Sequence, residues 1–112
     1  MIESPEWPHH YKGKSLCTWH VVVDSSEKIA LRFNTFALEE DNTCSKAKLV
    51  VRDGNSENAN VLGVYCGNRR PPELTSTGNH LLLQFTSTEG AEGRGFLLHY
   101  DIGNKKPLNP LQ

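Results

Sequence analysis

The sequence lacks the features that define several common classes of protein. No apolar run approaches the ~20 residues that a membrane-spanning helix needs, so we expect no membrane insertion by this chain. The formal net charge is -1 and the basic residues are scattered, which excludes the basic surface that nucleic-acid binding requires. The first residues, 1–5, have neither the basic start nor the apolar centre of a signal peptide. We therefore expect either a cytosolic protein or a piece of a longer one.

Catalytic motifs are also missing. The sequence has no HExxH, GxSxG, CxxC or glycine-rich phosphate loop, so we expect no enzyme and no cofactor. Five histidines suggest a metal site or a catalytic triad, but His20 and His99 each lie in a predicted strand on the side opposite the apolar residues. Exposed sheet histidines show this pattern. His9 and His10 are neighbours in a proline-flanked loop, where extended side chains diverge and chelate a metal poorly.

The sequence does contain a series of short strand patterns. Cys17, Trp19 and Val21 recur at the two-residue period of a β-strand. Similar patterns cover 29–33 with a continuation to 38, and then 49–52, 61–66, 81–85 and 96–100, separated by turn-forming residues. No window has a helical stripe. In a chain of 112 residues, this predicts one all-β domain, an antiparallel β-sandwich, at 1–102. The proline-containing stretch 103–112 is expected to be a tail or linker.

The cysteine content favours an extracellular protein. Three cysteines, nine glycines and six prolines suit a secreted β-domain with short turns. An odd number of cysteines in such a domain indicates a free thiol or a thiol paired outside the chain.

Five segments in order make the chain resemble a CUB domain, a jelly-roll-like extracellular β-sandwich module. The segments are Ser4-Pro-Glu-Trp-Pro8 with Tyr11; Cys17-Thr-Trp19; Ile29-x-Leu-x-Phe33 with Phe36-Ala-Leu-Glu39; Leu49-Val-Val-Arg-Asp-Gly54 with Leu62-Gly-Val-Tyr-Cys-Gly67; and Ser76-Thr-Gly-Asn79 with Leu81-x-Leu-x-Phe85, Gly95-Phe96 and Tyr100. We expect the aromatic residues of these segments to form the core: Trp19, Phe33, Phe36, Phe85, Phe96 and Tyr100.

The resemblance also implies a pairing of the cysteines. Many family members carry four cysteines, joined first to second and third to fourth. Cys17, Cys44 and Cys66 match the second, third and fourth, so Cys44 and Cys66 are expected to be bridged. Cys17 is left without its usual partner, which would precede the present start; an intermolecular disulfide is the alternative. Because Cys17 shares the inward side of its strand with Trp19, we expect its sulfur to be largely buried.

A calcium site is common in the family, and the sequence departs from it. The resemblance places the supporting tyrosine at Tyr11 and the ligand positions at Glu39, Ala47 and Thr88, so one carboxylate of three remains. Calcium prefers six to eight oxygen ligands, several of them anionic. Glu40, Asp41 and Glu89 flank these positions without occupying them. We therefore expect no metal site.

The function that the resemblance implies is protein–protein contact within a larger secreted or membrane-anchored protein. The expected partner is an extracellular protein. Two alternatives remain: a module that binds glycans or glycosaminoglycans, and a substrate-binding exosite of a protease. The candidate basic surface for a partner comprises Arg69, Arg70, Lys46 and Lys48, with Lys12 and Lys14 as further candidates for glycosaminoglycan binding.

Overall fold

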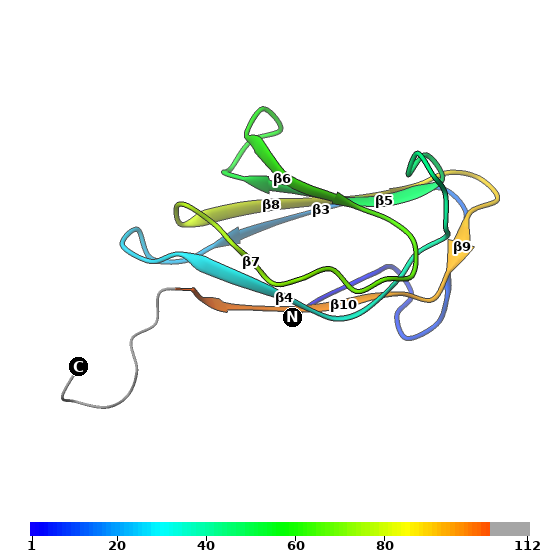
Figure 1. The fold of residues 1–112 in the computed structure, drawn as a ribbon, viewed down its shortest axis with the longest axis horizontal. Coiled ribbons are helices and arrows are strands. Elements are labelled where there is room, and N and C mark those ends of the chain that lie inside the picture. The colour runs from blue at the N-terminus through cyan, green and yellow to red at the C-terminus, as the bar shows by residue number, and fades with distance from the viewer. Residues whose placement is uncertain (104–112) are drawn as a thin grey trace.

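The computed structural model describes residues 1–103 and arranges them as a two-layer antiparallel sandwich (Figure 1). One sheet has the order β1 (Ile2–Glu3), β10 (Gly95–Ile102), β4 (Ile29–Ala37), β7 (Leu74–Thr75), and the other has β3 (Ser15–Val22), β8 (His80–Ser87), β5 (Ala47–Asp53), β6 (Asn60–Tyr65). A third, two-stranded sheet pairs β2 (Tyr11–Lys12) with β9 (Glu92–Gly93) at one end. The all-β prediction is confirmed. The predicted tail lies outside the described residues, apart from Gly103.

The six long strands coincide with the six predicted strand patterns, and the alternation of inward and outward side chains is clearest in β3 and β4. In β4, for example, Ile29, Leu31 and Phe33 are buried while Arg32 is exposed. Such alternation buries one face of each sheet. Each fully buried large apolar side chain contributes about 1.5–3 kcal/mol. The four two-residue strands were not predicted, since two residues are too few for a periodic pattern.

The core is aromatic, and Phe96 lies near its centre. The ring of Phe96 contacts Phe85 and Trp19 edge-on, with centroids 5.4 and 5.8 Å apart. Gly95 has a φ of 104°, and a Cβ at this position would lie 2.2 Å from Ser4 Oγ. Only glycine therefore allows the N-terminal segment to lie against β10, where Ser4 Oγ accepts a hydrogen bond from the Phe96 N–H.

Tyr100 does not belong to the core, so this part of the prediction is wrong. Its side chain is 43% exposed although it pairs with Leu31, which is fully buried. The reason is the short partner strand: β1 covers β10 only at Leu97 and Leu98, so the edge of the sandwich is open beside Tyr100. Trp19 packs against the core but is only partly buried, because β3 is an edge strand.

In the described residues, no helix is both long and apolar enough to span a membrane.

Candidate functional site

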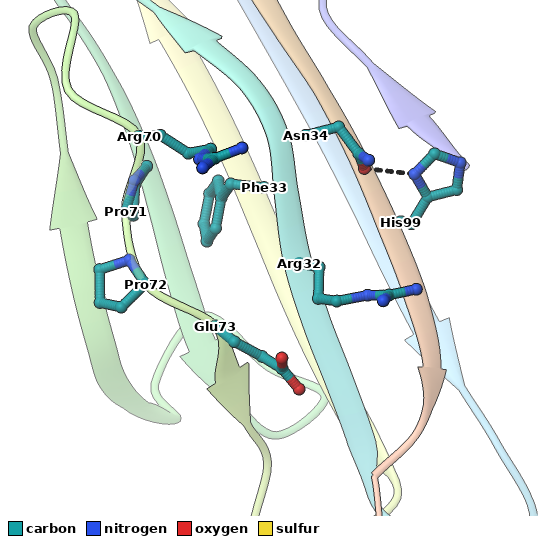
Figure 2. A pocket seen from close by; sticks show the side chains of 8 residues that line it. All are labelled: Arg32, Phe33, Asn34, Arg70, Pro71, Pro72, Glu73 and His99. Atoms are coloured by element: carbon teal, nitrogen blue, oxygen red, sulfur yellow. Dashed lines mark hydrogen bonds between the residues drawn. The ribbon is translucent and has the colours of Figure 1, made fainter.

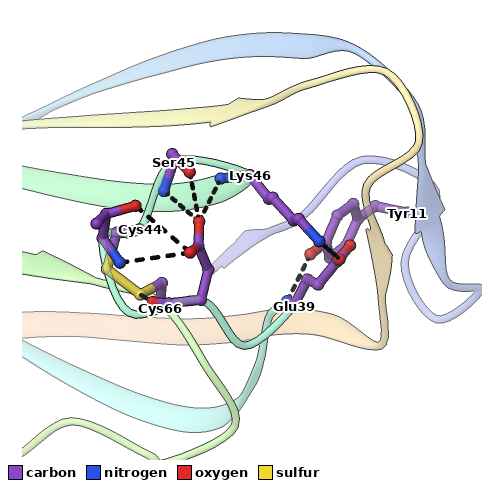
Figure 3. The surroundings of a disulfide bond; sticks show 8 residues. Tyr11, Glu39, Cys44, Ser45, Lys46 and Cys66 are labelled. Atoms are coloured by element: carbon purple, nitrogen blue, oxygen red, sulfur yellow. Dashed lines mark hydrogen bonds and ion pairs between the residues drawn. A yellow bond between two sulfur atoms is a disulfide. The ribbon is translucent and has the colours of Figure 1, made fainter.

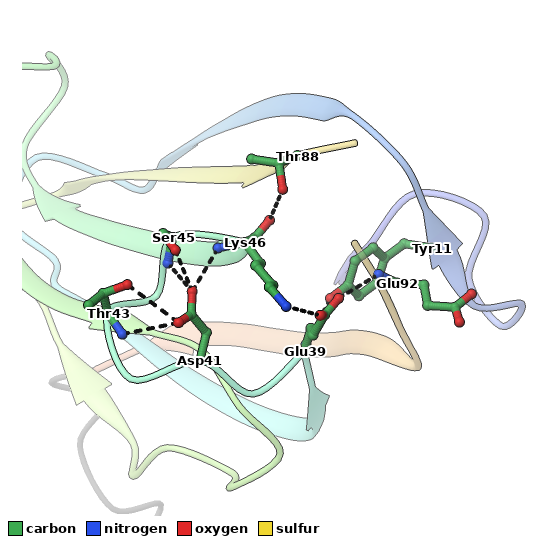
Figure 4. Close-up of polar contacts among 8 residues, drawn as sticks. All are labelled: Tyr11, Glu39, Asp41, Thr43, Ser45, Lys46, Thr88 and Glu92. Carbon is green, nitrogen blue, oxygen red and sulfur yellow. Dashed lines mark hydrogen bonds and ion pairs between the residues drawn. The ribbon is translucent and has the colours of Figure 1, made fainter. Parts of the chain in front are cut away.

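Tyr11 anchors one end of the sandwich, which we call the loop end and define by the side chains of Tyr11, Glu39, Asp41, Lys46, Thr88 and Glu92 (Figure 4). The Tyr11 ring is fully buried, and its hydroxyl accepts a hydrogen bond of 2.9 Å from the Glu39 N–H. Burial raises the pKa of the Tyr11 hydroxyl above its ordinary value. Tyr11 thus fixes the backbone where the chain leaves β4.

The Glu39 carboxylate is held from two sides. Its Oε1 accepts a hydrogen bond of 3.0 Å from the Glu92 N–H, and its Oε2 lies 3.1 Å from the Lys46 ammonium. The hydrogen bond from Glu92 and the one from Lys46 lower the pKa of Glu39. An internal cation therefore already neutralises the one carboxylate that remains at the calcium-ligand positions.

Asp41 organises the loop that leads to β5. Its Oδ2 accepts hydrogen bonds from the N–H groups of Ser45 and Lys46 at 2.7 and 3.0 Å and from the Ser45 hydroxyl at 2.5 Å, while Oδ1 faces Thr43 (Figure 4). The hydrogen bonds from Ser45, the side-chain bond above all, hold the pKa of Asp41 well below its usual range. Sequence reasoning placed Asp41 beside the site without giving it this loop-capping role.

The remaining calcium positions do not fit a calcium ion. Ala47 offers no side-chain oxygen and is buried in the core. Thr88 lies against the neighbouring strand: its N–H and its hydroxyl both donate to the Lys46 carbonyl, at 2.9 and 3.2 Å. Within the described residues, no three His, Cys, Asp or Glu side chains are grouped so that they could hold a metal ion. The donor set is therefore too small and too neutral for calcium.

A disulfide closes the loop end (Figure 3). Cys44 and Cys66 are bonded, with their Cα atoms 5.5 Å apart, in agreement with the pairing that the resemblance implied. The bridge ties the Asp41 loop to the end of β6, where the Gly67 carbonyl also accepts a hydrogen bond from the Leu38 N–H. Among the described residues, Cys17 forms no disulfide and is a free thiol. It is partly buried rather than largely buried, because its strand β3 forms the sheet edge.

The predicted basic surface is dispersed. Lys48 lies between the inward residues of β5 and so faces outward from the sheet that contains β5. Lys46 is engaged by Glu39 at the loop end. Arg69 and Arg70 precede β7, which belongs to the opposite sheet. These four residues do not form one surface.

Arg70 instead lies beside residues that sequence reasoning missed. It borders a depression of about 490 Å³ on the outer side of β4 (Figure 2). We call this the arginine depression, and it is lined by Arg32, Phe33, Asn34, Arg70, Pro71, Pro72, Glu73 and His99. Asn34 Oδ1 is hydrogen-bonded to His99 Nδ1. The outward phase of Arg32 in its strand was readable from the sequence, but its proximity to a loop that begins after β6 was not.

The arrangement of sheets, disulfide and loop end is that of a known module. A sequence profile of the CUB domain matches residues 1–100. The chain belongs to the CUB domain family. Human neuropilin-2 is 39% identical over 102 residues, which cover 90% of this chain and 11% of neuropilin-2. Human cubilin is 42% identical over 100 residues, covering 89% of this chain and 3% of cubilin. Human tolloid-like protein 1 is 35% identical over 96 residues, which cover 86% of this chain and 10% of tolloid-like protein 1.

Solved structures agree with this assignment. The full extracellular region of zebrafish Gpr126/Adgrg6 superposes with a TM-score of 0.80 at 27% identity, covering 90% of this chain and 13% of that one. The CUB1-EGF-CUB2 domain of human MASP-1/3 gives a TM-score of 0.79 at 28% identity, and the match covers 90% of this chain and 40% of that one. The MASP-1 CUB2 domain bound to Ca²⁺ shares the fold, with a TM-score of 0.77.

The chain spans about a tenth or less of the curated relatives described above. CUB relatives are extracellular proteins or ectodomains, and this CUB domain belongs to the same compartment. CUB domains are generally non-catalytic modules. Where a relative is a protease, its catalytic part lies in another domain.

Proposed function

We propose that this CUB domain is a non-catalytic module through which a larger secreted or membrane-anchored protein contacts a protein partner, without calcium. The proposed independence from calcium rests on the ion pair of 3.1 Å between Lys46 and Glu39. Lys46 is 57% exposed, so the pair lies at the surface, and a partner's lysine or a calcium ion would compete with its ammonium for the Glu39 carboxylate. The loop end is therefore a structural element, and partner recognition lies elsewhere on the surface.

Support for the module function comes from the relatives and from the surface. The matching parts of neuropilin-2, tolloid-like protein 1 and cubilin are small pieces of long proteins, as expected of a repeated interaction module. The depressions on the described surface are partly open to solvent, whereas the sites of enzymes that act on small molecules are usually enclosed.

The test is a binding screen of the 112-residue chain against a panel of purified ectodomains, in 2 mM calcium and in chelator. We expect a saturable protein partner whose dissociation constant is equal in the two buffers. A partner that is lost in chelator would overturn the calcium-independent part.

Two further assays decide between the proposal and its alternatives. Retention on heparin without any ectodomain partner would replace the proposal with glycosaminoglycan binding, which the dispersed lysines and arginines disfavour. In the full-length protein, loss of cleavage of one macromolecular substrate on deletion of residues 1–103, with cleavage of small peptides kept, would replace it with a protease exosite.

A further inference from the structure

The arginines of this domain differ in whether the structure already uses them. Arg52 is held on one side by Gln84, with Nε 3.1 Å from Oε1, and on the other by the Ala59 carbonyl, also at 3.1 Å. Arg32 and Arg70 are exposed, and in the described residues neither guanidinium has a hydrogen-bond or ion-pair partner. Arg52 is therefore structural, whereas Arg32 and Arg70 are free to bind a ligand.

The two free guanidiniums border one depression. Figure 2 shows Arg70 extending from the loop before β7 toward β4, while Arg32 extends from β4 toward β10. Phe33 borders the depression with only the 5% of its surface that is exposed, because its ring packs against Phe36 and Tyr65 in the core, and Pro71 and Pro72 form an apolar wall. The depression has a volume of about 490 Å³ and is open to solvent.

We propose that the arginine depression binds an acidic peptide segment of a protein partner. A planar guanidinium donates two parallel hydrogen bonds to a carboxylate, so Arg32 and Arg70 each provide a site for an aspartate or glutamate side chain. The apolar wall of Pro71 and Pro72 then takes an aliphatic or aromatic side chain next to the acidic one. This inference rests on the proposed function, because it names the partner's chemistry at a surface of the same module.

A peptide fits this depression better than a sulfated polysaccharide. A polyanion gains affinity from a continuous series of cations. This depression has two guanidiniums and also the Glu73 carboxylate, whose side chain extends from the start of β7 toward β4. Glu73 repels a densely sulfated chain. A peptide can avoid it, because a peptide carries its charges at separate positions and pairs them with apolar side chains. The hydrogen-bonded Asn34 and His99 add polar groups for a peptide backbone.

The experiment selects ligands from a random dodecapeptide library displayed on phage, with the wild-type 112-residue chain immobilised. We expect the enriched sequences to combine aspartate or glutamate with a neighbouring aliphatic or aromatic residue. The best sequence is synthesised with a fluorescent label, and its dissociation constant is measured by fluorescence polarisation. Arg70→Glu and Arg32→Glu should each weaken binding at least tenfold. Arg70→Lys should weaken it less, because lysine keeps the charge and loses the bidentate geometry.

The matched control is Arg69→Glu, which reverses the charge of the adjacent arginine that does not line the depression. Arg69→Glu should leave the dissociation constant within twofold, and all variants should melt within about 2 °C of wild type. Equal loss in Arg69→Glu and Arg70→Glu, enrichment of non-acidic peptides, or displacement of the peptide by a heparin octasaccharide at lower concentration than by the unlabelled peptide would each overturn the inference.

The failure of this inference is distinct from that of the proposed function. An ectodomain partner that binds wild type, Arg70→Glu and Arg32→Glu equally well would overturn the arginine depression as its site and leave the interaction module intact. An ectodomain partner whose binding is lost in chelator, in a chain that still binds acidic peptides through Arg70, would support the depression and contradict the calcium-independent part of the broader proposal.

Discussion

The loop end and the arginine depression both carry charged side chains, and they differ in whether those charges are satisfied. At the loop end, Glu39 is paired with Lys46, and Asp41 accepts hydrogen bonds from the loop that it caps. In the arginine depression, Arg32 and Arg70 have no such partners among the described residues. A charge that the fold already satisfies stabilises the fold, while an unsatisfied exposed charge remains available to a ligand. This difference supports the proposed separation of roles, with the loop end as a structural element and the arginine depression as the recognition surface.

The largest expected effect comes from opening the loop end. Replacing Cys44 and Cys66 with alanine removes a bridge between residues 22 apart in sequence, which costs about 3 kcal/mol of unfolding free energy in the chain-entropy model. Chemical denaturation of the double variant measures this loss, with Cys17→Ala as the control that should change stability little. Mass mapping of the non-reduced wild type should show the Cys44–Cys66 link. A link from Cys17 to either residue would contradict the assignment.

A smaller effect is expected at the buried anchor. Tyr11→Phe removes the hydroxyl that accepts the Glu39 N–H and should cost about 1 kcal/mol, because a partly buried donor is left without its partner. Tyr65→Phe is the matched control, since the Tyr65 hydroxyl makes no hydrogen bond among the described residues and should be lost without measurable cost. Equal losses in the two variants would contradict a specific contribution from the hydrogen bond between Tyr11 and Glu39.

Sequence reasoning succeeded where local pattern decides the structure. The two-residue period of 17–23 and 29–33, and the short apolar runs between turn residues elsewhere, predicted the six long strands. The match of Cys44 and Cys66 to the family pattern predicted their bridge. It failed where long-range geometry decides. Tyr100 has the inward phase of its strand, yet β1 is too short to cover it. The grouping of Arg32 with Arg70 depends on how a loop crosses β4, which no periodic pattern encodes.

The pH dependence of stability should report on the satisfied charges of the loop end. Hydrogen bonds lower the folded-state pKa of Asp41 below its ordinary value of 3.8. Its contribution is therefore fully present above pH ~4 and is lost as the pH falls toward the folded-state pKa. Asp41→Asn should melt below wild type at pH 7, and the difference should shrink between pH 4 and pH 2. Glu40→Gln, an exposed neighbour, should follow the wild-type profile. A constant gap between Asp41→Asn and wild type across this range would contradict the assignment.

The smallest expected effect is that of calcium, and it tests the comparison most directly. If Lys46 neutralises Glu39 while Ala47 and Thr88 supply no further charge, millimolar calcium should leave the melting temperature equal to that in chelator. A ligand at a hundredfold excess over its dissociation constant would add about 2.7 kcal/mol, or roughly 10 °C for a domain of this size. Lys46→Ala frees Glu39 but restores no missing ligand, so it should also show no calcium-dependent rise. A rise in wild type that Glu39→Gln abolishes would return the recognition role to the loop end, because its carboxylates would then be available to a cation despite the internal ammonium.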